Sequence, residues 1–252
     1  SKKYVEFIEN IQKSNHITHL DADTYFGKGS LNAAKRGVGA NISAVNAVMS
    51  GDFNNAFSAI RPPGHHAETE KAMGFCIFGN VAIAAKYAIE NHKLKRVAVV
   101  DFDVHHGNGT QEILWDDPNV LFVSTHQMPL WPGSGTHEEH GKHQNILNIP
   151  IQANTDGPAF RQKFDEIILP RLDSYKPEIL IISAGFDAHY KDPLANIELM
   201  TEDYEWITHR LCDIADKHAD GRIISSLEGG YNLAALAESV AVHVKVLMER
   251  SK

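Results

Sequence analysis

Six short runs of apolar and β-branched residues alternate along this chain with longer stretches of helical pattern. The short runs are apolar on both faces, which is typical of strands in a parallel sheet that is covered on both sides. The predicted strands are Phe57–Ile60, Arg96–Val100, Val120–Ser124, Asn145–Ile149, Ile179–Ser183 and Ile223–Leu227. The predicted helices are Asn32–Met49, Asn80–Glu90, Gly157–Tyr175, Thr201–His218 and Asn232–Arg250. This alternation predicts an α/β fold with three layers, α/β/α, and a mainly parallel central sheet.

The length and hydropathy of the chain suit one domain of this kind. It has 252 residues, of which 43% are hydrophobic and 22% charged, so a disordered chain is excluded. The longest apolar runs, Val97–Val100 and Ile179–Ile182, are far shorter than the roughly 20 residues that cross a membrane. No basic stretch followed by an apolar one opens the chain, so we expect neither membrane association nor secretion. The first residue is Ser1 rather than Met, which indicates a processed or partial sequence.

Charge, cysteine and histidine content narrow the class of function. The net charge of −8 argues against direct binding of nucleic acid and suits a cationic partner. The two cysteines, Cys76 and Cys212, form neither a disulfide framework nor a CxxC zinc site, and we expect a reducing, cytoplasmic compartment. The 15 histidines are the unusual feature, because histidine is the usual neutral metal ligand and acid–base group near pH 7.

Polar and glycine-rich turns follow five of the predicted strands. In open parallel sheets the ligand site lies beyond the carboxyl ends of the strands, so these turns are expected to meet at one edge. The five segments are Arg61–Ala67, Asp101–Gly109, Ser124–His126, Ser183–Ala188 and Glu228–Asn232. One such turn is weak evidence, whereas five at the same edge predict a single functional site.

The segment Asp101-x-Asp103-x-His105 has the spacing of a metal site. Alternate side chains of an extended segment lie on one face, so Asp103 and His105 can reach one ion. Asp187, which follows another strand, is the best candidate for the third ligand. Two carboxylates and one imidazole leave a fourth position open, which is the pattern of a catalytic rather than a structural zinc site. A solvated strand end is the alternative explanation for the motif alone.

Two adjacent histidines, His65 and His66, lie on a Pro-Gly turn. Neighbouring side chains diverge, so the pair suits two acid–base positions better than one shared ion. Each imidazole needs a partner that fixes its tautomer, and Asp101 and Asn108 can serve. A carboxylate behind one ring and an amide behind the other would give the two rings different pKa values. Two surface histidines in a loop are the alternative.

Aromatic residues near these turns are further candidates. Tyr231 follows Gly229–Gly230, which let the backbone approach a site closely, and its hydroxyl can donate to an oxyanion; a core tyrosine is equally expected. Phe75 and Trp131 can wall a narrow channel for an aliphatic chain, although either alone is more often a core residue. We interpret the histidine-rich segment 137–143 as a solvated loop.

Taken in order, the motifs resemble those of the histone deacetylase family. They are RPPGHHA, GFCIF, DFDVHHGNGTQ, VSTHQ, WPGSG, ISAGFDAH, KDPL and LEGGYN. The resemblance covers about residues 20–250. Asn108 stands where class I members have Asp, which indicates the class II and bacterial acetylpolyamine amidohydrolase-like branch. The resemblance implies the arginase-like α/β deacetylase fold and a single catalytic domain over residues 1–252. It also implies that some tens of residues, including a first strand and an entrance loop, are missing before Ser1.

The resemblance also implies a role for each site residue. The implied zinc ligands are Asp103, His105 and Asp187; the implied catalytic set is His65 backed by Asp101, His66 backed by Asn108, and Tyr231 as carbonyl polariser. The residues implied to line the substrate tunnel are Phe75, Trp131, Gly74, Leu194 and Asp23. Trp131 stands where family members more usually have Phe or Tyr. A potassium ion is implied beside the zinc, held by Asp101, Asp103, His105 and Ser124.

The implied reaction is zinc-dependent hydrolysis of the amide of N-acetyl-lysine, in a peptide or protein, or of a similar acetylated amine, to acetate and a free amine. Leu194 follows Asp192-Pro193, where relatives specialised for polyamines carry Glu, and this favours acetyl-lysine. An acetylpolyamine amidohydrolase is the first alternative. A ureohydrolase with two manganese ions and a non-catalytic acyl-lysine binding module are the others. The sequence leaves the oligomeric state open.

Overall fold

The computed structural model describes residues 1–13 and 16–251, and its centre is a parallel sheet of six strands. The strands lie in the order β3-β8-β7-β4-β5-β6, and every neighbouring pair is parallel. All six predicted strands are present: β3 Asn55–Ser58, β4 Val97–Asp101, β5 Val120–Gln127, β6 Ile146–Ile151, β7 Ile179–Ala184 and β8 Ile223–Leu227. The predicted α/β class with a mainly parallel sheet is therefore confirmed.

The strands alternate their side chains between two separate cores. In β4, Val97 and Val99 belong to one core, whereas Ala98 and Val100 belong to the other. Because successive side chains of a strand point to opposite faces, a strand that is apolar throughout must be covered on both sides. This explains why the strand segments show continuous apolar runs in the sequence rather than alternation.

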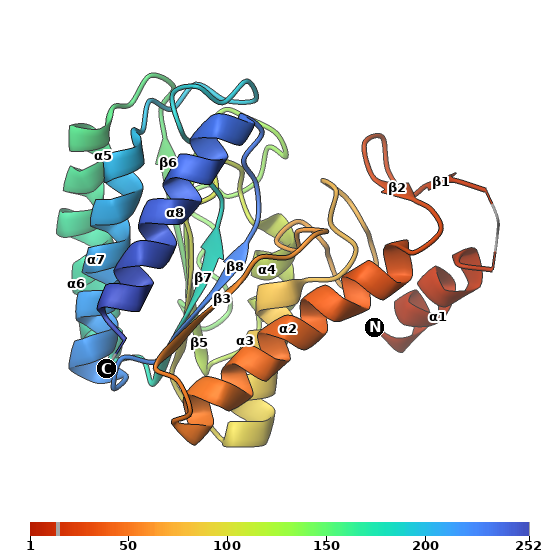
Figure 1. Ribbon diagram of the computed structural model, residues 1–252, viewed down its shortest axis with the longest axis horizontal. Helices are drawn as coiled ribbons and strands as arrows, with labels where there is room; N and C mark the ends of the chain where they lie inside the picture. Colours follow the sequence, from red (N-terminus) through yellow and green to blue (C-terminus); the bar gives the residue numbers. More distant parts are fainter. Residues whose placement is uncertain (14–15, 252) are drawn as a thin grey trace.

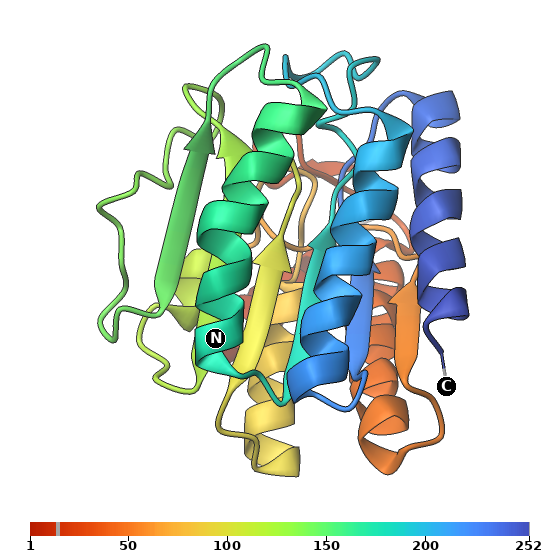
Figure 2. The same cartoon turned by 90° about the vertical axis from the view of Figure 1, so that its left-hand side faces the viewer.

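Two layers of helices cover the sheet, as Figures 1 and 2 show. One face is covered by α2 Ser30–Ser50, α3 Asn80–His92 and α4 Asn108–Leu114. The other is covered by α5 Gly157–Lys163, η1 Phe164–Ile168, α6 Leu169–Tyr175, α7 Thr201–His218 and α8 Leu233–Glu249. The predicted helix over 157–175 is thus continuous but includes one π-helical turn. Neither α4 nor the elements that precede residue 30 were predicted from the sequence.

A small peripheral unit precedes the sheet in the chain. Helix α1 Lys2–Ile11 and the strand pair β1 Thr18–His19 and β2 Tyr25–Phe26 lie to one side of the sandwich in Figure 1. Tyr4, Ile8 and Phe26 form a third apolar cluster there, and the Tyr4 hydroxyl donates to the carbonyl oxygen of Ile77 at 2.8 Å. Within the described residues, no helix combines the length and the apolar character that crossing a membrane requires.

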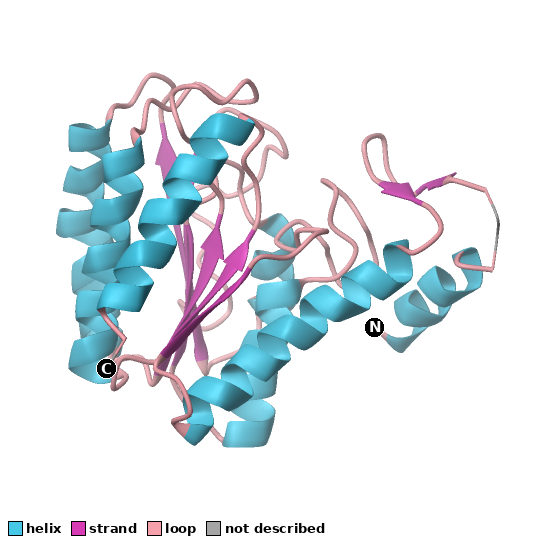
Figure 3. Ribbon diagram, viewed as in Figure 1, coloured by secondary structure: helices cyan, strands magenta, loops and turns pink. Residues whose placement is uncertain are grey.

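The sheet changes direction beside its central strand. From β4 the chain moves outward through β5 and β6, and then returns to β7 on the other side of β4. The loops that follow the strands gather at one end of the sheet, where the arrowheads point in Figure 3. Such a switch point leaves a crevice between two diverging loops, and ligands of open α/β sheets bind there. The loops after β4 and β7 carry Asp103, His105 and Asp187.

Candidate active site

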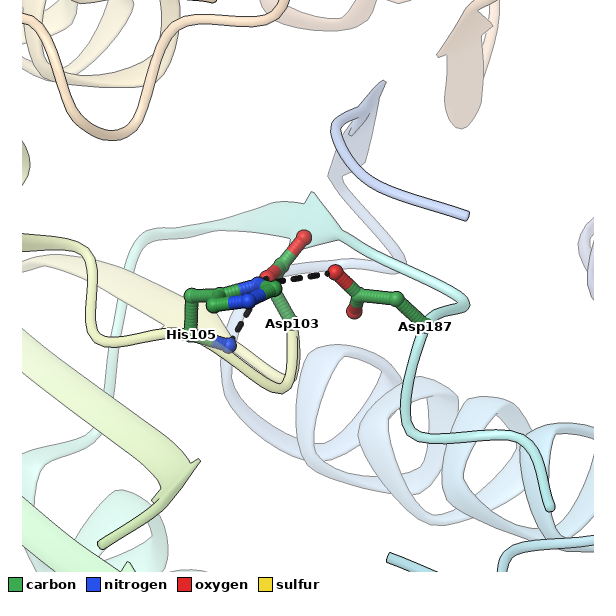
Figure 4. A group of neighbouring side chains, drawn as sticks. All are labelled: Asp103, His105 and Asp187. Atoms are coloured by element: carbon green, nitrogen blue, oxygen red, sulfur yellow. Dashed lines mark hydrogen bonds and ion pairs between the residues drawn. The ribbon is translucent and has the colours of Figure 1, made fainter. Parts of the chain in front are cut away.

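Three buried side chains converge at the switch point (Figure 4). Nδ1 of His105 lies 3.0 Å from a carboxylate oxygen of Asp187 and 3.3 Å from one of Asp103. The ligand atoms of the three residues all lie within 4.8 Å of one another. Among the described residues, this is the one group of His, Cys, Asp and Glu side chains with the spacing to hold a metal ion. The structure thus brings the three predicted zinc ligands together.

Backbone groups fix the two carboxylates in place. The amide of Val104 donates to Oδ1 of Asp187 at 2.8 Å, and the amide of Gly229 donates to Oδ2 of Asp103 at 2.9 Å. Gly185 lies so close to Asp103 that a β-carbon there would overlap with the carboxylate. Each of these donors comes from a different strand end, so the ligands are oriented by the sheet rather than by one loop.

The charges of the group fit a divalent cation. Burial and the neighbouring charge of Asp103 raise the pKa of Asp187 to about 7. Burial opposes a charge on His105, but its hydrogen bonds with the two carboxylates raise its pKa to about 10. Two buried carboxylates therefore lie together, and the imidazoles of His105 and His65 are the neighbouring groups that can balance their charge. Buried carboxylates need a positive partner, and a set of two oxygens and one nitrogen with one open position suits catalytic zinc.

The two adjacent histidines lie beside this group and differ in their partners. Nδ1 of His65 lies 3.0 Å from Oδ2 of Asp101, and Nδ1 of His66 lies 2.8 Å from Oδ1 of Asn108. The ring centroids of the pair are 3.9 Å apart. These are the pairings that the sequence analysis predicted, and they place a carboxylate behind one ring and an amide behind the other.

The electrostatics of the pair differ in the expected direction. Burial opposes protonation of His65, but the charges of Asp103 and Asp101 raise its pKa well above the usual value. Burial and the neighbouring charge of His65 lower the pKa of His66 well below the usual value. The surroundings therefore favour the protonated form of His65 and the neutral form of His66, so one pocket contains two imidazoles with different proton affinities.

Tyr231 approaches the same pocket from the end of β8. Burial raises the pKa of its phenol above the ordinary value, so the hydroxyl remains protonated and is available as a donor. Its backbone amide donates to Oδ2 of Asp192 at 2.7 Å, and Oδ1 of the same carboxylate accepts from the amide of Leu194 at 3.1 Å. Asp192 thus joins the Tyr231 turn to the Leu194 turn. It was not among the predicted site residues, although it lies in the KDPL motif.

Glu228 is a second residue that the sequence analysis missed. It is buried, and its Oε2 accepts from the amides of Gly64 and His65 at 2.6 and 3.1 Å. Burial raises its pKa to about 7. Its side chain therefore positions the turn that carries His65 and His66, the two candidate catalytic histidines. The partners are more than 160 residues apart in the chain, so no local pattern could have shown the contact.

A cavity of about 200 Å³ leads from these groups to the surface. We call the buried residues beyond the strand ends the floor: His65, His66, Asp103, His105 and Asp187. We call the loop residues around the opening the rim: Asp23, Gly74, Phe75, Trp131 and Leu194. All five rim residues line the cavity, together with His66, His105, Leu130 and Tyr231. The predicted substrate-tunnel residues therefore lie around one opening above the predicted metal ligands.

The rim is built by loops in tight contact with the floor. The rings of Trp131 and His66 lie 4.6 Å apart between centroids. Gly74 has a φ of +55°, and a β-carbon there would overlap with both of these rings, so the position requires glycine. The ring centroids of Phe75 and Tyr231 lie 6.0 Å apart. The backbone amide of Phe75 donates to the Thr24 hydroxyl at 3.0 Å.

The histidine-rich segment 137–143 is largely exposed, as predicted. Glu139 within it nevertheless makes several hydrogen bonds that hold the neighbouring loop. Its Oε1 accepts from the amides of Gly135 and Thr136 at 2.9 and 2.8 Å, and its Oε2 accepts from Gln111 at 2.5 Å. His106 joins this network because its Nε2 lies 3.0 Å from Oε1 of Gln111, and its Nδ1 lies 2.8 Å from the Ser134 hydroxyl. These contacts fix the loop that carries Trp131.

Ser124, the remaining predicted potassium ligand, lies directly beside the floor. It pairs in register with Asp101 across β4 and β5. Its hydroxyl lies 3.0 Å from Nδ1 of His126. The residues of the predicted potassium site are thus neighbours, and the ion itself stays a prediction.

Fold and site together define a class of protein: a three-layer α/β sandwich with a buried candidate metal group beside acid–base side chains. A parallel sheet positions a buried Asp-His-Asp group at its switch point, and a histidine pair and a tyrosine surround it. The comparison with protein families agrees, because residues 1–247 match the model of the histone deacetylase domain. The chain belongs to the histone deacetylase domain family.

Relatives from several kingdoms are similar to this chain. An uncharacterized protein of Synechocystis is 43% identical over 91% of the chain and 73% of its own length. Histone deacetylase 10, chloroplastic, of rice is 46% identical over 73% of the chain and 42% of its own length. A histone deacetylase-like amidohydrolase of Pseudomonas aeruginosa is 40% identical over 85% of the chain and 58% of its own length. The chain therefore spans between about two fifths and three quarters of these relatives.

A solved structure is similar across nearly the whole chain. The crystal structure of the HDA15 HD domain superposes with a TM-score of 0.93 and 33% sequence identity, over 99% of this chain and 70% of that one. This similarity extends the confirmed fold class from the sheet to the complete arrangement of its layers. It leaves the substrate of this chain to be argued from the site.

Proposed function

We propose that this chain is a zinc-dependent deacetylase that hydrolyses the amide of N-acetyl-lysine, in a peptide or protein, to acetate and a free amine. The observation that carries the proposal is the buried Asp103–His105–Asp187 group at the bottom of a narrow cavity with aromatic walls. Those three residues would hold the zinc ion. When bound, zinc at this position supplies Lewis-acid polarisation of the amide carbonyl and makes a nearby water more acidic.

The protein supplies the proton transfers. His66 lines the cavity, and because Asn108 occupies its Nδ1, Nε2 is the nitrogen available to the substrate. A neutral Nε2 can take the proton of the attacking water and later deliver a proton to the leaving amine. His65, held by Asp101, lies behind this ring and contributes positive charge close to the developing oxyanion. Tyr231 donates from the cavity wall to the same oxyanion.

The rim residues suit an aliphatic acyl-lysine chain. Phe75 and Trp131 are 40% and 42% exposed, so each presents part of an apolar ring to whatever enters the cavity. Leu194 adds a third apolar surface. Asp23 lies at the same opening and can accept hydrogen bonds from the substrate backbone. We also propose a potassium ion beside the metal group, held by Asp101, Asp103, His105 and Ser124; hard oxygen ligands from backbone and hydroxyl groups favour such an ion.

A second candidate substrate, an acetylated polyamine, is favoured by one observation. Asp23 is an acidic side chain at the cavity opening, where the distal ammonium group of a polyamine could pair with it. Asp23→Asn separates the two substrates, because an amide oxygen still accepts from a peptide backbone but no longer pairs with a cation. The expected result is a larger loss of activity on acetylputrescine than on a peptide, if both are turned over.

The experiment that tests the proposed function measures turnover of an acetyl-lysine peptide and of acetylputrescine by the zinc-loaded protein. A zinc chelator is then added, and zinc is restored afterwards. We expect peptide turnover that the chelator abolishes and zinc restores. Turnover of acetylputrescine alone would replace the peptide by the polyamine as substrate. Turnover of neither substrate by fully zinc-loaded protein would contradict the proposal.

A further inference from the structure

Behind Asn108 lies a glutamate that none of the roles above uses. Nδ2 of Asn108 donates to Oε1 of Glu68 at 2.8 Å and also contacts the sulfur of Met73 at 3.4 Å. Both amino hydrogens of the amide are therefore directed away from His66. Oδ1, the remaining polar atom of the amide, faces Nδ1 of His66 at 2.8 Å.

The carboxylate decides which way the amide points. An ionised carboxylate only accepts hydrogen bonds, whereas an amide can present either its oxygen or its nitrogen. If Asn108 turned over, its oxygen would face the Glu68 carboxylate, and two acceptors would be left opposed. Asn108 is 8% exposed, and the reversed amide would lose the hydrogen bond that Nδ2 donates to this carboxylate. Glu68 therefore holds the amide in the orientation that presents Oδ1 to the imidazole.

The amide in turn decides the tautomer of the imidazole. Opposite Oδ1 of Asn108, Nδ1 of His66 must carry the hydrogen, which leaves a lone pair on Nε2, the nitrogen toward the cavity. A reversed amide would donate to Nδ1 and move the hydrogen to Nε2. In that tautomer the ring cannot accept a proton from a water in the cavity.

The backbone keeps the three side chains in register. The amide of Thr110, in the first turn of α4, donates to the carbonyl oxygen of His65 at 3.0 Å, which ties the Asn108 helix to the histidine turn. The amide of Glu68 donates to the carbonyl oxygen of Lys71 at 2.9 Å, which closes the loop that carries the carboxylate. Glu68 and Asn108 also line a separate cavity of about 510 Å³. Glu68 is not among the residues that line the substrate cavity.

We propose that Glu68 is a positioning residue for the proposed deacetylase reaction, which sets the tautomer of His66 through Asn108. The inference rests on the proposed function for its kinetic consequence, although the tautomer itself can be observed without turnover. Outer partners of this kind typically contribute about 10–100-fold when they orient a functional group. The contribution should fall on kcat, because Glu68 lies outside the substrate cavity.

The test combines ¹⁵N NMR of labelled histidine with steady-state kinetics on the zinc-loaded protein. In Glu68→Ala we expect His66 to populate the Nε2–H tautomer and kcat to fall about 10–100-fold at unchanged KM. In Glu68→Gln the side-chain oxygen still accepts from Asn108, so tautomer and kcat should largely return. The matched control is Glu70→Ala, which removes the same charge from an exposed neighbour two residues away. It should leave both readouts unchanged.

A second variant guards against a merely structural effect of the alanine. In Glu68→Ala combined with Asn108→Asp, both oxygens of the new carboxylate accept from Nδ1, so the Nδ1–H tautomer should be restored without Glu68. If Glu68→Ala leaves both the tautomer of His66 and kcat unchanged, the inference is wrong. It is also wrong if neither Glu68→Gln nor the double variant recovers the Nδ1–H tautomer. Absence of turnover in the unmodified protein would instead contradict the proposed function, and the NMR comparison would still decide the inference.

Discussion

The floor and the rim of the cavity are built in different ways. Asp103 and Asp187 of the floor are each 1% exposed, and backbone amides that follow other strands of the sheet hold their carboxylates. Trp131 and Leu194 of the rim are 42% and 45% exposed and lie on loops. The sheet therefore fixes the chemistry, whereas loops that can vary without disturbing the sheet surround the substrate. Changes in the floor should abolish turnover, and changes in the rim should alter which substrate binds.

The largest expected effect comes from a metal ligand. In Asp187→Asn the group loses one of its two carboxylates, so zinc binding should weaken by more than the 10–100-fold that loss of an outer partner costs. Turnover of the acetyl-lysine peptide should fall with the bound zinc. Elemental analysis and kinetics on the same preparation measure both. If the variant keeps one zinc per chain and normal turnover, Asp187 is not a zinc ligand.

Tyr231 tests the boundary between the two regions, because its ring contacts Phe75 of the rim while its hydroxyl is assigned to the chemistry. Tyr231→Phe keeps the ring and removes the donor. We expect kcat to fall about 10²–10³-fold, as for other oxyanion donors, with KM little changed. Steady-state kinetics on the peptide provide the measurement. A rise in KM at constant kcat would assign the residue to the rim.

A rim substitution should act on binding. Trp131→Ala removes one aromatic wall while the network of Glu139 and Ser134 still holds the loop. Loss of an apolar pocket contact is typically worth about 1–3 kcal/mol, so we expect KM to rise about tenfold or more. The exposed neighbour Glu138 offers the matched control, Glu138→Gln, which should change neither constant. An equal loss of kcat at constant KM would show that Trp131 positions His66 instead.

The smallest effect on turnover is expected beneath the floor, where the consequence falls on stability instead. His243 is fully buried and packs against Phe102 and Phe186, which flank the metal ligands in sequence. The Thr208 hydroxyl donates to a backbone carbonyl, so it accepts from Nδ1 of His243 at 2.7 Å, and Nε2 accepts from Ser225 at 2.9 Å. The neutral ring is thus fully hydrogen-bonded, and burial lowers its pKa from 6.5 to about 3.

The depressed pKa of His243 makes the free energy of unfolding depend on pH. Because the folded pKa of His243 is depressed, the unfolded chain binds the proton first as the pH falls below 6.5. The contribution of the neutral ring to stability is complete above that value. It is lost by up to about 1.4 kcal/mol per pH unit between pH 6.5 and about 3. Urea unfolding at pH 8, 6 and 5 should show a steeper acid loss for the unmodified protein than for His243→Gln. Equal slopes would contradict this assignment.

The fold and the candidate metal group could be predicted from local signals, whereas the roles of the other site residues followed from the family resemblance. Continuous apolar runs marked all six strands, and the polar turns after them marked the floor. Strand ends shifted by one to three residues, since pairing with neighbours decides where a strand stops. Helix α4 was missed because it is short and begins within the glycine-rich turn that holds Asn108.

The residues that hold the site in place could not be predicted in the same way. Glu228, Asp192, Glu139 and Glu68 are single acidic residues without periodic pattern, and each acts through contacts with groups outside its own segment. For Glu228 the backbone amides it binds are more than 160 positions away. Such contacts exist only once the strands are ordered in the sheet, so a reading of the chain in sequence order cannot find them.

We propose that one zinc ion, held by Asp103, His105 and Asp187, makes this chain a deacetylase. The most direct test removes all metal from the purified protein and adds zinc back in steps, while bound zinc and turnover of an acetyl-lysine peptide are measured together. We expect turnover to rise in proportion to bound zinc and to stop rising at one ion per chain. Turnover that survives metal removal, or that requires two manganese ions per chain, would contradict it.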